Sequence, residues 1–157
     1  MIKINVVAVG KVKEKYFAQG IEEYKKRLGK YCEFSLIEIA EENYAKVDDK
    51  LIESIKQKEG EKILSAVKGK VFAMAIEGQK LSSEKLAKQI KTLVDSGEGV
   101  ITFVIGGSYG LSDAVKNRAD GLLSFSDMTF PHTLFRLMLT EQLYRAFSIN
   151  AGSAYHK

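Results

Sequence analysis

Three glycines follow an apolar run near the middle of the chain, in the segment Phe103–Asp113 (FVIGGSYGLSD). Glycine lets a backbone approach a ligand closely and adopt positive φ angles, so one interpretation is a small cofactor held largely by backbone groups. A phosphate is a second interpretation, because Ser112 predicts a helix start whose N-terminus would attract an anion. The glycine spacing is neither GxGxxG nor a P-loop, which weakens the phosphate interpretation.

The same glycines match a third pattern, GxSxG, in which Ser108 would be the nucleophile of a hydrolase. Asp127 and His156 follow in the order serine, acid, histidine. In such enzymes, however, the helix begins at the serine, whereas here the capping residue Ser112 comes four residues later. The five strands expected below are also too few for that fold. We therefore disfavour the hydrolase, and labelling of Ser108 by a fluorophosphonate would reverse this interpretation.

A second candidate segment, FSDMTFPH, runs from Phe125 to His132. Its mixture of aromatic, sulfur and small hydroxyl side chains is suited to holding an adenine while main-chain groups bind its edge. Its apolar side chains are equally compatible with a core. The chain has two histidines, and either is a candidate general base: His132 closes this segment and His156 is the penultimate residue. The simpler interpretations are a hydrogen-bonding residue at a helix start and a frayed tail.

The elements that would position these residues alternate between strands and helices. Apolar, β-branched runs predict strands over 4–9, 34–39, 71–76, 100–105 and 121–125. Helical spacing and capping signals predict helices over 16–28, 48–67, 82–97, 112–118 and 133–149. This alternation predicts an α/β fold, a parallel sheet flanked by helices in one domain over 1–157. Ligands bind at the carboxyl ends of such strands, where the loops expected over 77–81, 106–112 and 126–132 form the candidate site.

Composition and charge narrow the class of protein. No apolar run approaches the roughly 20 residues that span a bilayer, and the N-terminus lacks a signal-peptide cleavage site. A single cysteine, Cys32, excludes an internal disulfide, so we expect a cytoplasmic protein without membrane or metal partners. Residues 1–30 carry eight Lys or Arg against three Glu, and this basic region is either a contact for a phosphate backbone or a solvated helix face. The last predicted helix is apolar over more than one face, which indicates a dimer or else a deeply buried monomer core.

Several segments, taken together, resemble a known family. They are AVGKVKEKY, EGEKIL, VIGGSYGLS, LSFSDMTFPH, EQLYRAFSI and the terminal AYHK. From end to end, in the same order and at matching length, the chain resembles the ribosomal RNA large subunit methyltransferase H (RlmH) family of the SPOUT class. No single segment is specific, but the combination is.

The resemblance implies a fold and a function. The fold would be an α/β-knot, with a C-terminal trefoil knot within about 71–157, in a homodimer; this is an exception to the rule that chains do not knot. The cofactor would be S-adenosylmethionine (SAM), bent into the knotted loops near the dimer interface. The reaction would be methylation of N3 of a pseudouridine in 23S rRNA, position 1915 in the usual numbering, on the assembled 70S ribosome. A non-catalytic ribosome- or RNA-binding protein of the same fold is the alternative, and it would not bind SAM.

By motif, the resemblance also assigns residues to the site. The cofactor contacts would be Met74, Gly106, Phe125, Ser126, Asp127, Met128, Thr129 and Phe130. Met74 replaces the family's usual leucine, a change that conserves volume, and the segment 77–80 also departs from the family pattern. The target N3 must lose a proton, so His132 and His156 are hypothetical catalytic bases. Tyr155 and His156 are expected to fold over the pocket. The expected RNA contacts are Arg136, Arg145, Tyr155, Lys11, Lys13 and Lys15.

Overall fold

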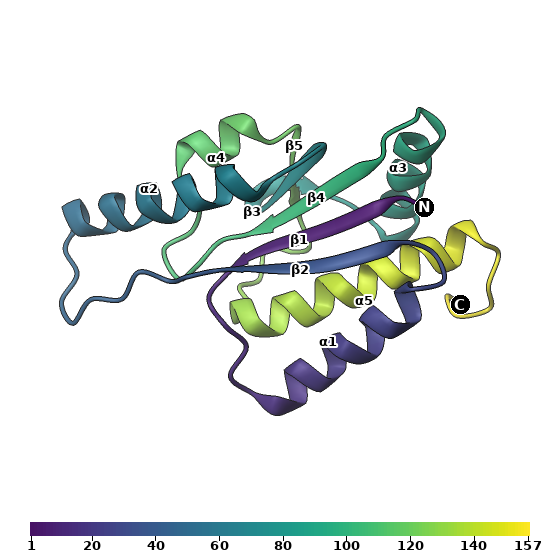
Figure 1. Ribbon diagram of the computed structural model, residues 1–157, viewed down its shortest axis with the longest axis horizontal. Helices are drawn as coiled ribbons and strands as arrows, with labels where there is room; N and C mark the ends of the chain where they lie inside the picture. Colours follow the sequence, from purple (N-terminus) through teal and green to yellow (C-terminus); the bar gives the residue numbers. More distant parts are fainter.

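The computed structural model describes all residues, 1–157, as alternating strands and helices (Figure 1). The strands are β1 (Lys3–Val9), β2 (Glu33–Ile39), β3 (Lys70–Lys80), β4 (Val100–Ile105) and β5 (Gly121–Ser124). The helices are α1 (Lys15–Leu28), α2 (Asp49–Ala66), α3 (Ser83–Asp95), α4 (Asp113–Arg118) and α5 (His132–Asn150). All strand pairs are parallel, in the order β2-β1-β4-β3-β5. The predicted parallel α/β sheet is therefore confirmed.

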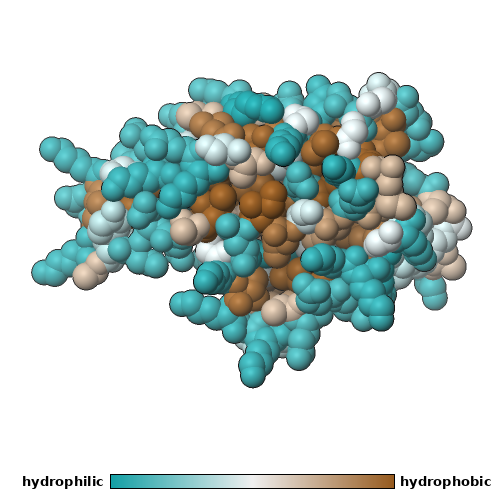
Figure 2. All heavy atoms as spheres, viewed as in Figure 1, coloured by the Kyte–Doolittle hydropathy of each residue, from teal (hydrophilic) through white to brown (hydrophobic).

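Helices cover both faces of the sheet (Figure 1). Because successive side chains of a strand point to opposite faces, Val6 packs in a core with residues of α1, α3 and α5, while its neighbour Val7 packs with residues of α2 and α4. Figure 2 shows apolar side chains across the middle of the molecule and hydrophilic ones over its outer helices. Both faces of the sheet are thus buried under helices, as is usual for a parallel sheet. None of the helices combines the length and apolarity needed to cross a membrane.

Three helix starts are fixed by side-chain caps, of which the one at Ser112 was named from the sequence. Asp48, Ser82 and Ser112 each accept a hydrogen bond from the backbone N–H three residues further on, at 2.8, 3.1 and 3.3 Å. The Ser112 cap matters most for the site, because it ends the glycine-rich loop between β4 and α4.

Strand β3 departs from the prediction. The sequence suggested a strand ending at Ile76 and a loop over 77–81, but β3 continues to Lys80. Its pairing with β5 shifts on the way, so that Met74 and Gln79 both pair with Leu123. A Cβ on Gly78 would lie 2.6 Å from the backbone of Leu122 and Leu123, an approach that only glycine permits. The expected loop is therefore an irregular strand held against β5 by main-chain contact, which periodicity does not reveal.

Replacing Gly78 with alanine is expected to lower the free energy of unfolding by about 1–3 kcal/mol, because the new methyl group would overlap backbone atoms that cannot rotate away. Gly99→Ala is the control, since a Cβ there meets nothing within 4 Å. Urea unfolding of both variants measures the difference. Equal stability of the two would contradict the backbone contact between β3 and β5.

Candidate functional site

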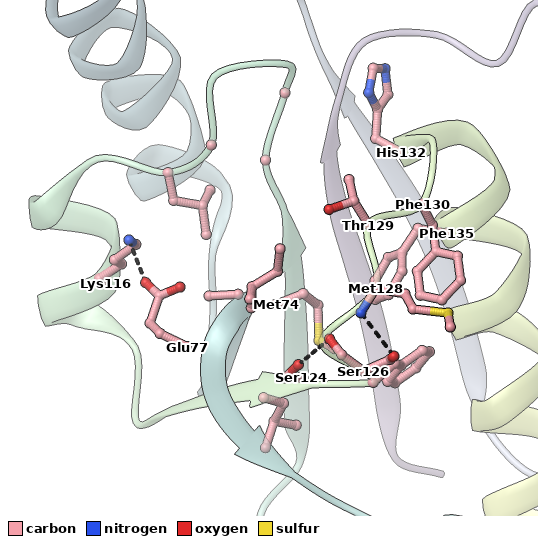
Figure 3. A pocket seen from close by; sticks show the side chains of 18 residues that line it. Met74, Glu77, Lys116, Ser124, Ser126, Met128, Thr129, Phe130, His132 and Phe135 are labelled. Carbon is pink, nitrogen blue, oxygen red and sulfur yellow. Dashed lines mark hydrogen bonds and ion pairs between the residues drawn. The ribbon is translucent and has the colours of Figure 1, made fainter.

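A cavity of about 320 Å³ opens at the carboxyl ends of β4 and β5, beside residues 74–77 of β3 (Figure 3). Its walls come from this part of β3, the glycine-rich loop, α4, the loop after β5 and the start of α5. The volume lies at the lower end of the range for small-molecule sites. The sheet therefore places its cavity where parallel α/β folds bind ligands.

Seven of the eight residues predicted to contact a cofactor line this cavity. They are Met74, Gly106, Phe125, Ser126, Met128, Thr129 and Phe130. The eighth, Asp127, does not, because its carboxylate forms an exposed ion pair with Lys80 at 2.6 Å. Segments far apart in the sequence thus converge on one site, as the motifs suggested.

The loop after β5 is held in shape by its own hydroxyl groups. Ser124 Oγ donates to the carbonyl of Ser126 at 3.0 Å, and Ser126 Oγ accepts from the backbone N–H of Met128 at 3.0 Å (Figure 3). The Met128 side chain stays largely exposed at the cavity, with 72% of its surface accessible. A flexible thioether in that position is suited to covering a bound ligand.

One wall of the cavity is aromatic. The ring of Phe125 lies 4.8 Å from that of Phe135, and Phe130 stacks on Phe135 at 6.5 Å. All three rings are half-buried and line the cavity, so they are not simply core residues. Flat apolar rings of this kind can pack against a planar ligand such as a purine.

A charged pair forms a polar end of the cavity. Lys116 Nζ donates to Glu77 Oε1 at 2.6 Å (Figure 3), and this hydrogen bond lowers the pKa of the Glu77 carboxyl. Glu77 begins the candidate loop 77–81 that the sequence predicted, whereas Lys116 and Phe135 were not predicted as site residues. The helical positions of Lys116 and Phe135 carry no motif, and only the convergence of α4 and α5 with β3 makes them neighbours.

Substitutions at Phe125 and Asp127 should distinguish a residue of the loop after β5 that contacts the ligand from one that does not. Phe125→Ala removes part of the aromatic wall and is expected to weaken binding of the cofactor that the resemblance implies by about tenfold, roughly 1.4 kcal/mol. Asp127→Ala breaks only an exposed ion pair, worth at most about 1 kcal/mol, and should change binding less than about threefold. Calorimetric titration of both variants with S-adenosylhomocysteine tests this, and a larger loss for Asp127→Ala would reverse the assignment.

The two histidines occupy different environments. His132 lines the cavity at the first residue of α5, and its ring makes no hydrogen bond with another protein group. His156 lies outside the cavity, where Nε2 is 2.7 Å from Glu84 Oε1 and Nδ1 is 3.0 Å from Arg145 Nη1. Because arginine can only donate, Nδ1 of His156 must accept and Nε2 carries the proton. Both ring nitrogens of His156 are therefore engaged, whereas the ring of His132 has a nitrogen free to accept a proton.

The tail packs against helices. The Tyr155 hydroxyl is 3.3 Å from that of Tyr24 on α1, and the Arg145 guanidinium lies over the Tyr155 ring at 4.9 Å. Burial, and then the hydrogen bond to Tyr24, raise the pKa of Tyr155 to about 12. Within the single chain, Tyr155 and His156 therefore do not close over the pocket as expected. Partners on α1, α3 and α5 hold the tail away from it.

Arg136 also differs from its predicted role. Its side chain is 0% exposed, donates from Nη1 to Glu38 Oε2 at 2.7 Å, and donates from Nη2 to the carbonyls of Val9 and Gly10. A guanidinium enclosed in this way cannot reach RNA, so the expected RNA contact is wrong for this residue. The Arg145 side chain is 25% exposed and paired with Glu141. Lys11, Lys13 and Lys15 are exposed and remain predicted RNA contacts.

The structure does not assemble the serine hydrolase site. The only side-chain partner of the Ser108 hydroxyl is Glu41, at 3.4 Å, while the other two members of the expected triad pair with Lys80 and Glu84. No group of three or more His, Cys, Asp or Glu side chains is placed to hold a metal ion. Cys32 is buried, and this burial raises the pKa of its thiol to about 12.

Comparison with known proteins agrees with the fold. A family model described as "Predicted SPOUT methyltransferase" matches residues 2–156. The ribosomal RNA large subunit methyltransferase H of Latilactobacillus sakei subsp. sakei is 50% identical over 159 residues, covering 99% of this chain and 100% of that protein. Its counterpart from Clostridioides difficile is 52% identical with the same coverage. A solved structure, a probable methylase family protein from Haemophilus influenzae Rd KW20, shares the fold with a TM-score of 0.53 at 12% identity, over 99% of this chain and 70% of that one. The chain therefore belongs to the ribosomal RNA large subunit methyltransferase H family of SPOUT methyltransferases.

Proposed function

We propose that this protein transfers a methyl group from SAM to N3 of a pseudouridine in 23S rRNA, position 1915, on the assembled 70S ribosome. The observation that carries the proposal is the convergence of the glycine-rich loop and the FSDMTFPH segment on one cavity, in a chain with full-length relatives named ribosomal RNA large subunit methyltransferase H. The aromatic wall fits an adenine, and the polar end at Glu77 and Lys116 fits the charged part of an amino-acid moiety.

The reaction requires the protein mainly to position the cofactor and the acceptor base. SAM supplies an activated methyl group, and transfer needs the acceptor nitrogen in line with it at about 3–3.5 Å. The acceptor is an imide N–H, so a nearby base must take its proton. His132 is the cavity histidine with a free ring nitrogen, and we assign this role to it.

We also infer that the chain is knotted and dimeric. The knot is supported by the match of residues 2–156 to the SPOUT methyltransferase family, whose fold is expected to be knotted. The dimer is supported by a second cavity, of about 520 Å³, between α1, α3 and α5, where Leu134, Leu137 and Met138 of α5 stay only half-buried. A dimer would cover these side chains.

Binding to ribosomal RNA would use the basic start of the chain. Lys11, Lys13 and Lys15 are exposed in and just after the β1–α1 connection, and none of them forms an ion pair within the chain. Phosphate contacts of this kind give affinity without sequence specificity. Recognition of one base therefore needs the shape that the assembled ribosome presents in the cytoplasm.

The deciding experiment measures transfer of a labelled methyl group from SAM to bacterial 70S ribosomes that lack this modification, with free subunits and naked rRNA alongside. We expect label at N3 of one pseudouridine of 23S rRNA, in assembled ribosomes only. Equal labelling of naked rRNA would contradict the requirement for the ribosome. Binding to ribosomes without SAM binding would favour the non-catalytic alternative, and binding of neither would overturn the proposal.

A further inference from the structure

Helix α2 passes behind the glycine-rich loop, and two adjacent residues of its EGEKIL segment touch that loop. A Cβ added to Gly107 would lie 3.2 Å from Glu59 Oε1, and a Cβ added to Gly60 would lie 2.5 Å from Ser112 Oγ. Gly106, Gly107 and Gly110 line the cavity, whereas Glu59 and Gly60 do not. The Glu59–Gly60 pair therefore supports the loop from outside the site, near its first and last residues.

The Glu59 carboxyl group is placed between the loop and a second segment. Its Oε2 accepts a hydrogen bond from the backbone N–H of Glu42 at 3.2 Å, in the connection between β2 and α2. The neighbouring Glu41 accepts from the Ser108 hydroxyl at 3.4 Å. The glycine-rich loop and the β2–α2 connection thus meet at Glu59.

This arrangement is costly for stability alone. Glu59 is 3% exposed, and its Oε1 is buried without a hydrogen-bond partner, which is unfavourable. Gly60 lies inside a helix, where glycine is less favourable than alanine. An apolar residue in place of Glu59 would avoid this cost, so its carboxyl group points to a role in the loop it lies against, whereas Gly60 is needed because a Cβ there would lie 2.5 Å from Ser112 Oγ.

We propose that Glu59 is a positioning residue of the cofactor site: its carboxyl group, held by Glu42 and set against Gly107, fixes the loop Gly106–Gly110 at the cavity and so sets the affinity for SAM. The proposal rests on the proposed function, because SAM is the ligand whose affinity is set. What matters is the length of the side chain, since its terminal oxygen Oε1 is the atom of Glu59 that a Cβ on Gly107 would approach, at 3.2 Å.

The buried carboxyl group also has a pH signature. Burial raises the pKa of Glu59 above its ordinary value of 4.5; the charges of Glu41 and Glu42 raise it further, against the Glu42 N–H bond and Lys62, which lower it. Because the folded state binds this proton more tightly than the unfolded state, the stability from this group is present below pH 4.5 and is lost as the pH rises through the folded pKa.

Glu59→Gln keeps the length of the side chain and cannot lose a proton. We expect its melting temperature to exceed that of the wild type at pH 8, and the difference to shrink as the pH falls toward 4.5. Thermal unfolding across this range measures it, with Glu61→Gln as the control, because Glu61 is an exposed residue of the same helix. A lower melting temperature for Glu59→Gln at pH 8 would show that the buried charge is not destabilising.

Steady-state kinetics of the full chain on 70S ribosomes, with calorimetry of SAM, tests the positioning role. Glu59→Asp keeps the charge but withdraws the carboxyl group by one methylene, and we expect KM and Kd for SAM to rise about tenfold while kcat stays within about twofold. This tenfold change corresponds to about 1.4 kcal/mol. Glu59→Gln should keep both constants within about threefold of the wild type, and the control Glu61→Asp should leave them unchanged.

A merely structural role would change the melting temperature of Glu59→Asp without changing KM well below that temperature. A folded Glu59→Asp that binds SAM like the wild type would therefore overturn the inference. So would an equal loss of affinity in Glu59→Gln, because length alone would then not explain it. If the wild type itself binds no SAM, it is the proposed function that fails.

Discussion

Replacement of His132 with alanine is expected to lower kcat for methyl transfer by a factor of about 10² to 10⁴, the range that a positioned general base supplies. KM for SAM should change little, because the aromatic wall and the glycine-rich loop are left intact. The effect follows from geometry: His132 is the cavity residue with a free ring nitrogen, at the start of α5.

The matched control is His156→Ala. Both ring nitrogens of His156 are engaged, by Glu84 and Arg145, so its loss should loosen the tail rather than remove a base. We expect a smaller decrease in kcat for this variant. Single-turnover measurement of both variants on 70S ribosomes separates chemistry from product release. If both single variants keep the wild-type rate, base catalysis by histidine is wrong, and positioning alone must account for the reaction.

Local signals predicted the architecture, and the family resemblance supplied most of the residues that line the cavity. The central strands β1 and β4 are β-branched runs buried on both faces, and the cap at Ser112 was visible as a helix start, so the end of the glycine-rich loop could be placed. Seven of the eight expected cofactor residues line the cavity because their segments end neighbouring strands of one parallel sheet.

Features that depend on distant contacts could not be predicted in the same way. The segment 77–80 has the glycine and polar residues of a loop, yet it is part of β3 because its backbone packs on β5. The tail, including Tyr155, carries motif residues but no sign of the partners on α1, α3 and α5 that hold it. The orientation of a side chain relative to a distant element is fixed by tertiary packing, and sequence spacing does not encode it.

The helical spacing of Arg136 indicated a buried position, but its residue type argued for exposure. Arg136 shares a helical stripe with Leu139, Thr140 and Leu143, all of them buried. An arginine is almost never fully buried unless it is paired, and its usual role at RNA suggested exposure. The structure supplies the pairing: Glu38 of β2 and two carbonyls at the end of β1 surround the guanidinium.

Arg136→Met is accordingly expected to lower the free energy of unfolding by about 1–3 kcal/mol, because buried carbonyls lose their donor, while the Glu38 carboxylate, 40% exposed, can be solvated by water. Methionine fills much of the volume, but it leaves the carbonyls of Val9 and Gly10 without this donor. Arg136→Lys should recover only part of the loss, because a single ammonium group cannot reach Glu38 and both carbonyls as the planar guanidinium does.

The control is Arg118→Met, which breaks an exposed pair with Asp120 at 3.7 Å and should cost less than about 1 kcal/mol. Urea unfolding of the three variants gives the comparison. The bond to Gly10 ties α5 to the start of the connection that carries Lys11 and Lys13, while α5 begins at His132 of the cavity. Loss of Arg136 should therefore weaken ribosome binding as well as stability, at temperatures where the variant is still folded. A stable Arg136→Met with normal ribosome affinity would mean that the basic connection and the cofactor site are positioned independently of each other.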